Sequence, residues 1–239
     1  MHQIKVGFMI VINKSEDRGS FKNSWLDAKF SFEFGSYRNS ERRGFSDLIV
    51  FNDDIVQPKS GFTEHSHSNV EVMSYPLMGE IEHRDSIGNC QRVSYGDVHL
   101  MRAGKGISHS EMNPSDSEIE HHVQWWIKPK NLDSDPSYQL CTFTPEDKVG
   151  RLCLIASDNS ADGVLCVDQD VRIYASILTP IELVWKVPMN RRAYLHVLSG
   201  GVAINDFALS AGDAIFVGNC TTIAISSLDS AEVLLFDLR

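Results

Sequence analysis

The sequence predicts an all-β protein made of two barrel-like domains. Short runs rich in β-branched and aromatic residues recur between glycine- and proline-containing turns along most of the 239 residues. Stretches with an apolar repeat of about 3.6 residues, which would predict long helices, are scarce. A weak internal repeat is the third observation, because it indicates two halves built on one plan.

Nine runs have the composition of strands and are bounded by turn residues. In chain order they are Asp47–Phe51, Val70–Tyr75, Gln91–Val93, Val98–Met101, His122–Ile127, Arg172–Leu178, Tyr194–Leu198, Ala214–Val217 and Glu232–Phe236. The apolar run Val6–Ile12 is too short for a membrane span, and we expect an early strand there. Phe21–Phe30 has a plausible helical spacing and predicts a short helical or irregular segment. Strands at this spacing are typical of a sandwich or barrel.

One polar segment divides the chain. Lys128–Pro136 holds two prolines and alternating charges between two apolar runs, which is the composition of a linker. We therefore expect an N-terminal domain at residues 1–130 and a C-terminal domain at residues 131–239.

The internal repeat places the same turn residues in both halves. Gly79 and Gly96-Asp97 in the first half correspond to Gly200 and Gly212-Asp213 in the second. The glycines are expected to supply positive φ at tight turns, and each Asp is expected to cap its turn. Each half then holds one unit of strand, Gly turn, strand, Gly-Asp turn and strand.

The composition disfavours several classes of protein. A formal net charge of -10 and a pI near 5.3 argue against direct binding to nucleic acid or to an anionic membrane. The five cysteines lack both CxxC spacing and the density of a secreted scaffold, so we expect reduced thiols in a mature, soluble, cytoplasmic protein. A catalytic Ser–His–Asp arrangement, a phosphate loop and a dinucleotide fingerprint are not visible, which disfavours hydrolases and nucleotide-dependent enzymes.

Two pairs of side chains carry the chemistry. His65 and His67 are two residues apart, as are His109 and Glu111, and both pairs follow glycine-rich turns. Side chains two apart on a strand point to one face, so two such pairs on neighbouring strands can converge on one ion. One HxH pair alone is more often unrelated to metal, but two pairs reverse that judgement. Three imidazoles and a carboxylate suit Fe, Mn, Co, Ni, Cu or Zn better than Ca or Mg.

The other histidines and the paired tryptophans are interpreted as structural. His121 and His122 are adjacent on an expected strand, so one faces inward and one outward. We expect one of Trp125 and Trp126 in the core and the other at a domain interface. Three histidines occur singly in strand contexts and are not expected to bind metal, namely His83, His99 and His196.

The two pairs lie in stretches that resemble the two cupin motifs, His65–Glu71 followed by Gly79, and Gly106–Asn113. A wider set of motifs is similar to the pirin family of bicupins, namely Trp25–Asp27, Gly44–Ser46, Asn52–Asp54, Glu82–Ser86 with Gly88-Asn89, Gly106–Glu111 with Asn113–Ser115, and Val233–Asp237. The resemblance covers nearly the whole chain from about Arg18 onward. It implies two tandem jelly-roll-type cupin barrels.

The resemblance implies the same four metal ligands as the strand argument, His65, His67, His109 and Glu111. Many other cupins use a glutamate at the position of Glu71, which stays an alternative ligand or a partner that orients an imidazole. The pirin family usually has Pro between the two histidines and a charged pair after them, whereas this chain has Ser66 and Ser68-Asn69. These changes leave the ligands intact and are expected to alter the rim of the pocket.

The second half lacks this constellation. When the glycine turns are aligned, Lys186–Met189 and Ile225-Ser226 fall where the two pairs stand in the first half, and neither stretch holds a histidine. We therefore expect a C-terminal cupin domain without metal ligands.

The resemblance also implies a reaction. Several bacterial pirin-like proteins cleave flavonols such as quercetin with O₂, giving a depside and carbon monoxide, so an aromatic small molecule and O₂ are the expected partners. The expected cofactor is one divalent transition-metal ion, first Fe(II), with Cu, Ni, Co, Mn or Zn as alternatives. Glu111 would be the catalytic base that accepts the substrate hydroxyl proton.

Two other functions stay open. The animal pirin that names the family is a nuclear co-regulator, so a metal-binding regulator that acts through protein partners is one alternative. A bicupin that acts on another small metabolite is the other.

Overall fold

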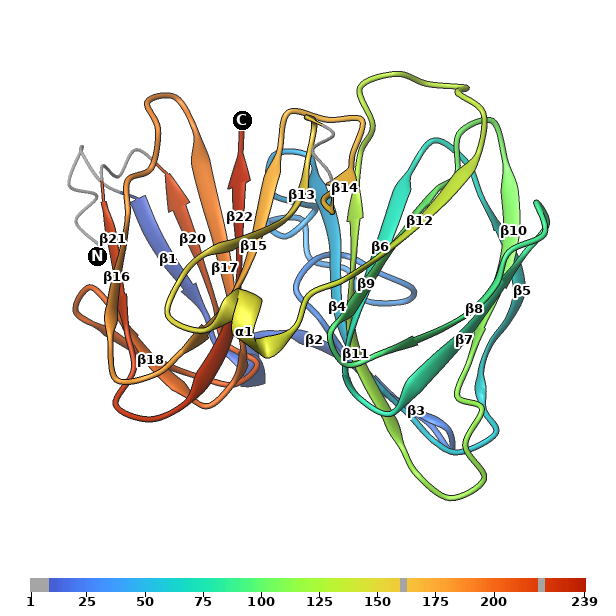
Figure 1. The fold of residues 1–239 in the computed structure, drawn as a ribbon, viewed down its shortest axis with the longest axis horizontal. Helices are drawn as coiled ribbons and strands as arrows, with labels where there is room; N and C mark the ends of the chain where they lie inside the picture. The colour runs from blue at the N-terminus through green and yellow to red at the C-terminus, as the bar shows by residue number, and fades with distance from the viewer. Residues whose placement is uncertain (1–8, 160–162, 219–221) are drawn as a thin grey trace. The chain divides into compact units, whose positions relative to one another are not determined.

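The computed structural model describes residues 9–159, 163–218 and 222–239, and nearly all of its regular structure is β (Figure 1). The all-β prediction is confirmed, and the nine runs expected as strands are strands. The helical elements of the described residues are α1 (Pro145–Lys148) and one 3-10 turn (Ser15–Asp17). No helix in these ranges is long and apolar enough to cross a membrane. The early strand is β1 (Met9–Asn13), while His2, Cys220 and the start of the run Val6–Ile12 lie outside the described residues.

Arg18–Thr144 and Ile155–Asp170 form one compact unit, called the N-terminal unit below. Its larger sheet contains β2 (Gly19–Lys22), β3 (Leu26–Phe30), β4 (Leu48–Val56), β6 (Glu71–Met78), β9 (Asp97–Arg102), β11 (Glu120–Ile127) and β12 (Ser137–Thr142). These strands lie in the order β12-β9-β6-β11-β4-β3-β2. Its smaller sheet contains β5 (Gly61–His67), β7 (Glu80–Asp85), β8 (Cys90–Ser94) and β10 (Ile107–Met112), in the order β5-β10-β7-β8. The segment 155–170 adds the parallel pairing of β13 (Cys153–Ser157) with β14 (Leu165–Cys166).

The described part of Met1–Asp17, with Pro145–Leu154 and Val171–Arg239, forms the C-terminal unit. Five strands of its larger sheet are β1, β15 (Arg172–Leu178), β17 (Arg192–Ser199), β20 (Ala214–Gly218) and β22 (Ala231–Leu238), in the order β1-β20-β17-β22-β15. Its smaller sheet contains β16 (Glu182–Trp185), β18 (Gly201–Ile204), β19 (Phe207–Ser210) and β21 (Ile223–Ser226), in the order β16-β21-β18-β19. The smaller sheets of the two units therefore have one topology.

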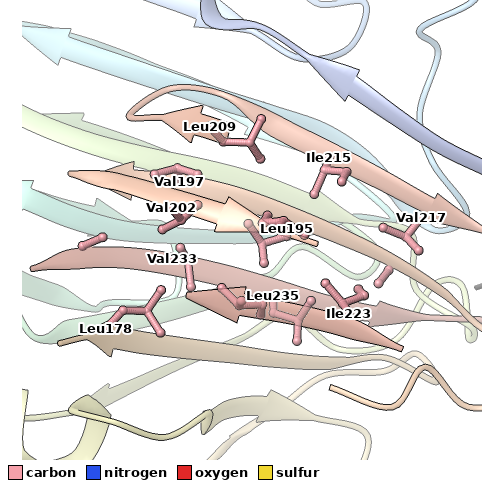
Figure 2. Close-up of a cluster of buried hydrophobic side chains, with 14 of the residues drawn as sticks. Leu178, Leu195, Val197, Val202, Leu209, Ile215, Val217, Ile223, Val233 and Leu235 are labelled. Atoms are coloured by element: carbon pink, nitrogen blue, oxygen red, sulfur yellow. The ribbon is translucent and has the colours of Figure 1, made fainter. Parts of the chain in front are cut away.

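The core of the C-terminal unit is aliphatic. Leu195, Val233 and Leu235 are completely buried, and they pack with Val202 and Ile223 from the smaller sheet (Figure 2). Full burial of such a side chain stabilises the fold by about 1.5–3 kcal/mol. This interior is consequently a packed hydrophobic core.

The repeat predicted from the turn residues is confirmed by the backbone. Gly79 and Gly200 have the same φ of 73°, and a Cβ there would lie 2.8 Å and 2.4 Å from a backbone oxygen. The Oδ2 atoms of Asp97 and Asp213 each accept a hydrogen bond of 3.0 Å from the backbone N–H three residues earlier. The turns of both halves therefore need the same residue types for the same reasons.

The expectation for Phe21–Phe30 was wrong. The segment forms the hairpin β2–β3, and the Asn23 side chain accepts hydrogen bonds from the backbone N–H groups of Trp25 (2.9 Å) and Leu26 (2.7 Å). Burial alternates along β3, with Leu26 and Phe30 inside, so the true apolar period is two. The apolar residues of a turn followed by a strand happened to have the spacing expected for a helix.

The two units interleave along the chain. β1 pairs with β20 and belongs to the C-terminal unit, whereas β12 and the segment 155–170 belong to the N-terminal unit. Lys128–Pro136 is free of strand and helix, as a linker should be, but the chain then returns to the same sheet as β12. The two compact units are therefore not separated by a single boundary near residue 130. The division into 1–130 and 131–239 stays a prediction about the sequence.

Candidate metal centre

Strands β5 and β10 bring three imidazoles together. The strands are antiparallel neighbours, and His109 pairs directly with His65. The ring centroids of His65 lie 4.8 Å from those of His67 and 4.5 Å from those of His109, and the last two are 5.0 Å apart. One ring nitrogen from each residue lies within 4.8 Å of the others, which is a spacing that can hold a metal ion.

Local contacts leave these nitrogens available as ligands. The Nδ1 of His65 donates to the backbone oxygen of Thr63 at 2.8 Å, which leaves Nε2 with its lone pair. His109 is 2% exposed, and neither of its ring nitrogens has a hydrogen-bond partner among the described residues. Burial lowers the pKa of His67 to about 4 and that of His109 to about 3, so both rings are neutral. Neutral, unpartnered imidazole is the form that binds a transition metal, and the site fits one.

Glu111 lies beside this cluster and is held by other polar groups. The strand pairing shifts register between His109 and Glu111. The Oε2 of Glu111 accepts a hydrogen bond of 2.8 Å from Gln124, and its Oε1 accepts one of 3.4 Å from Ser74. Burial alone would raise the pKa of Glu111, but His99 and His109 hold it well below its ordinary value, so the side chain is a carboxylate.

The carboxylate of Glu111 belongs to a second group of possible ligands, with His83 and His109. The structure thus unites His65, His67 and His109, and it places Glu111 next to one member of that trio. The four-ligand set expected from the sequence stays a prediction.

His83 and His99, which the sequence analysis did not expect to bind metal, are neighbours of the site, and His83 belongs to the second group of possible ligands. His83 is completely buried, with its ring centroid 5.3 Å from that of His109 and its Nε2 hydrogen-bonded to Asp85 at 3.1 Å. The Nε2 of His99 lies 3.4 Å from the Glu111 carboxylate, and its Nδ1 lies 3.2 Å from the Tyr138 hydroxyl. Both histidines occur singly in the sequence, and the pairing of β10 with β7 is what brings His83 opposite Glu111.

Glu71, the alternative ligand, makes its hydrogen bonds away from the three histidines. It is completely buried, and its carboxylate accepts hydrogen bonds from Arg102 Nε (2.8 Å) and from the backbone N–H of Asp168 (2.9 Å). It occurs in neither group of possible ligands in the described part of the chain. Its interactions tie the segment 155–170 to β6 and β9.

A cavity of about 660 Å³ opens beside the histidines within the N-terminal unit. His65, His67 and Glu111 reach it from the smaller sheet, while Asn52 and Gln124 reach it from the larger sheet. Aromatic side chains form much of its wall, namely Phe21, Trp25, Phe30, Phe34, Phe62 and Trp126. A volume of this size holds a drug-sized planar molecule.

The adjacent tryptophans and the adjacent histidines of β11 face opposite sides of the strand. Trp125 is completely buried in the core, as expected for one of the two tryptophans, but Trp126 lines the cavity and its ring lies 4.9 Å from that of His67. His122 is 1% exposed, while His121 faces outward and pairs with Asp53 at 2.7 Å. The strand alternation predicted this last division correctly.

The comparisons with known proteins agree with this geometry. The Pirin family model matches residues 12–127, and the Quercetinase C-terminal cupin domain model matches residues 154–238. A protein of Escherichia coli strain K12 named quercetin 2,3-dioxygenase is 37% identical over 231 residues, which covers 96% of this chain and 99% of that protein. A pirin-like protein of Caulobacter vibrioides is 34% identical, covering 92% of this chain and 95% of its own. The crystal structure of bacterial pirin YhhW from Escherichia coli in complex with nickel(II) superposes with a TM-score of 0.91 at 37% identity, covering 96% of this chain and 99% of that one.

Proposed function

The chain belongs to the pirin family of bicupins, and from that premise we propose that it is a metal-dependent dioxygenase that cleaves flavonols such as quercetin. The relative named quercetin 2,3-dioxygenase supports the substrate class, and the nickel-bound pirin structure supports a divalent metal. The observation that carries the proposal is the meeting of three imidazoles beside a cavity with aromatic walls. A ligand set with open positions suits a metal that binds substrate and O₂.

We assign the metal to His65, His67 and His109, with Glu111 as the fourth ligand. Three nitrogens and one carboxylate oxygen match the preference of a first-row divalent ion, and we take Fe(II) as the native metal. Such an ion supplies a Lewis-acid centre at which a deprotonated flavonol and O₂ can meet. Because affinities rise from Fe(II) to Cu(II), the purified protein can carry a metal other than the native one.

The side chains around the metal residues have separate tasks in this proposal. The Thr63 carbonyl fixes the ring of His65, so that Nε2 faces the other imidazoles. Glu111 accepts the proton of the flavonol hydroxyl, and Gln124 holds its carboxylate in place through the 2.8 Å hydrogen bond. Phe62 and Trp126 offer flat apolar surfaces to the substrate rings and exclude water.

Metal content and turnover test the proposal together. Protein reconstituted with Fe(II), Co, Ni or Cu would be mixed with quercetin first without and then with O₂, and the depside and carbon monoxide would be quantified. His65→Ala is the test variant, and His121→Ala is its control because His121 lies on the outer face of its strand. We expect turnover that needs O₂, metal and His65, and that survives in His121→Ala.

The other outcomes reassign the function. One bound metal per chain without turnover of any flavonol would favour a regulator that acts through protein partners. A much higher kcat/KM on another aromatic metabolite than on quercetin would favour the alternative of a bicupin that acts on a different substrate. Protein that binds no metal under any reconstitution would refute the metal centre itself.

A further inference from the structure

Two polar side chains in the cavity wall lack the partners that buried polar groups normally have. Asn52 and Asp54 lie on β4, in the larger sheet, and line the cavity that His65 and His67 reach from the smaller sheet. Asn52 is 2% exposed and Asp54 is 3% exposed. The Oδ1 atom of each has no hydrogen-bond partner among the described residues.

The surroundings of Asp54 make this feature specific. The neighbouring carboxylate, Asp53, faces the other way and pairs with Arg18 and His121. The Nε2 of His122 lies 3.8 Å from the Oδ2 of Asp54, within ion-pair range but beyond hydrogen-bond length, and the Nδ1 of the same ring is hydrogen-bonded to Glu120 at 2.8 Å. Buried polar atoms are almost always paired, so an Oδ1 atom without a hydrogen-bond partner beside a cavity indicates a partner that arrives from the cavity.

The chemistry of the two side chains describes that partner. Both offer an acceptor oxygen, and burial raises the pKa of Asp54 to about 7, so its carboxyl can also donate. A hydroxyl group can donate and accept, and it suits both residues. The aromatic walls next to them suit the flat ring that would carry such a hydroxyl.

We propose that Asn52 and Asp54 bind ring hydroxyl groups of the substrate across the cavity from the metal ligands, so that the cavity selects polyhydroxylated aromatics over apolar aromatics of the same shape. This inference deepens the proposed flavonol cleavage and rests on it for the identity of the substrate. It assigns specificity to Asn52 and Asp54, and it gives them no part in holding the metal.

Ligand binding to the metal-free protein tests the inference without turnover. Trp25 and Trp126 line the cavity, so quenching of tryptophan fluorescence reports occupancy. The probes are quercetin and 3-hydroxyflavone, which has the same ring system and keeps one hydroxyl group. We expect the wild type to prefer quercetin, and we expect Asp54→Leu and Asn52→Leu each to weaken quercetin binding about tenfold. Binding of 3-hydroxyflavone is expected to change less than twofold.

Matched variants exclude a loss of structure. Asp53→Asn makes a carboxylate change one residue away on the opposite face and is expected to leave both affinities unchanged. Asp54→Asn keeps the shape if Asp54→Leu fails to fold, and it is expected to weaken quercetin binding in the same direction. The thermal midpoint of Asp54→Leu should stay close to that of the wild type, because removal of a desolvated carboxyl offsets the loss of its 3.8 Å ion pair with His122. A purely structural Asp54 would give a lower midpoint with unchanged selectivity.

The inference and the proposed function fail in different ways. Selective quercetin binding that Asp54→Leu abolishes, without turnover by any metal form, would retain hydroxyl recognition and reject the dioxygenase. Turnover by the wild type, with the same ratio of kcat/KM for the two flavonols in Asp54→Leu, would retain the dioxygenase and overturn the inference. A wild type that binds both flavonols equally, or neither, would also overturn it.

Discussion

Replacing His109 by Leu is expected to stabilise the metal-free protein and to remove its response to metal. His109 is 2% exposed, and both ring nitrogens are buried without a partner among the described residues. A buried polar atom left unsatisfied costs about 1–3 kcal/mol, and Leu has a similar volume. Some strain from the different shape offsets part of the gain, so we expect a net gain of about 1–2 kcal/mol in the free energy of unfolding.

The metal-bound wild type should show the opposite advantage. A metal that binds only the folded chain adds about 2.7 kcal/mol when its free concentration is one hundred times its Kd. His109 is a ligand in the proposed site, so metal should add almost nothing to the free energy of unfolding of His109→Leu. His109 would then be a residue that costs stability for the sake of the metal.

Urea unfolding with and without metal measures both the stability gained by His109→Leu and the stability gained from metal. Three of the four tryptophans, Trp25, Trp125 and Trp126, lie in the N-terminal unit, so tryptophan fluorescence reports mainly on the unit that holds the site. His121→Leu is the control, because it removes an outward-facing imidazole and should keep the full response to metal. If metal-free His109→Leu is less stable than the wild type and still gains 2–3 kcal/mol from metal, about what linkage predicts for an intact site, His109 is structural and the assignment is wrong.

Three further outcomes follow from other parts of the structure. Gly200→Ala should lower the free energy of unfolding by about 2 kcal/mol more than Gly88→Ala, measured by thermal or urea unfolding. Both glycines have positive φ, but only at Gly200 would a Cβ lie 2.4 Å from a backbone oxygen. Equal losses would show that the close contact is relieved. Glu71→Gln should cost about 1.5–3 kcal/mol, because it weakens the charge-assisted hydrogen bond from Arg102, and it should leave metal content unchanged. Loss of metal, measured by mass spectrometry, would show that Glu71 is a ligand. Burial lowers the pKa of His122, but Glu120 outweighs it and raises this pKa from 6.5 to about 9. The charged His122 therefore stabilises the fold fully below pH 6.5, and this stabilisation is lost as the pH rises through about 9. His122→Gln should flatten the fall of the urea midpoint between these pH values, and an unchanged slope would contradict the assignment.

The candidate site was predictable to the extent that it depends on neighbours along the chain. A spacing of two residues fixes a common face on any strand, which is why His65 and His67 meet in the structure as the sequence implied. The glycine turns and their Asp caps are local in the same way, and the backbone confirms both copies. The Phe21–Phe30 error was local too, since a hairpin with a turn at Asn23 gave an apolar spacing like that of a helix.

The nine strand runs and the early strand, the turn residues, the family and the three residues of the imidazole cluster were predictable from the sequence. Tertiary structure alone decided that His83 and His99 stand beside Glu111, that Arg102 holds Glu71, and that β1 joins the C-terminal unit. It also placed Asn52 and Asp54 in the wall of the cavity, on a different sheet from the histidine cluster. The physical reason is that dihedral preferences and side-chain alternation act between residues near in sequence, whereas pairing of distant strands depends on the packing of the whole unit.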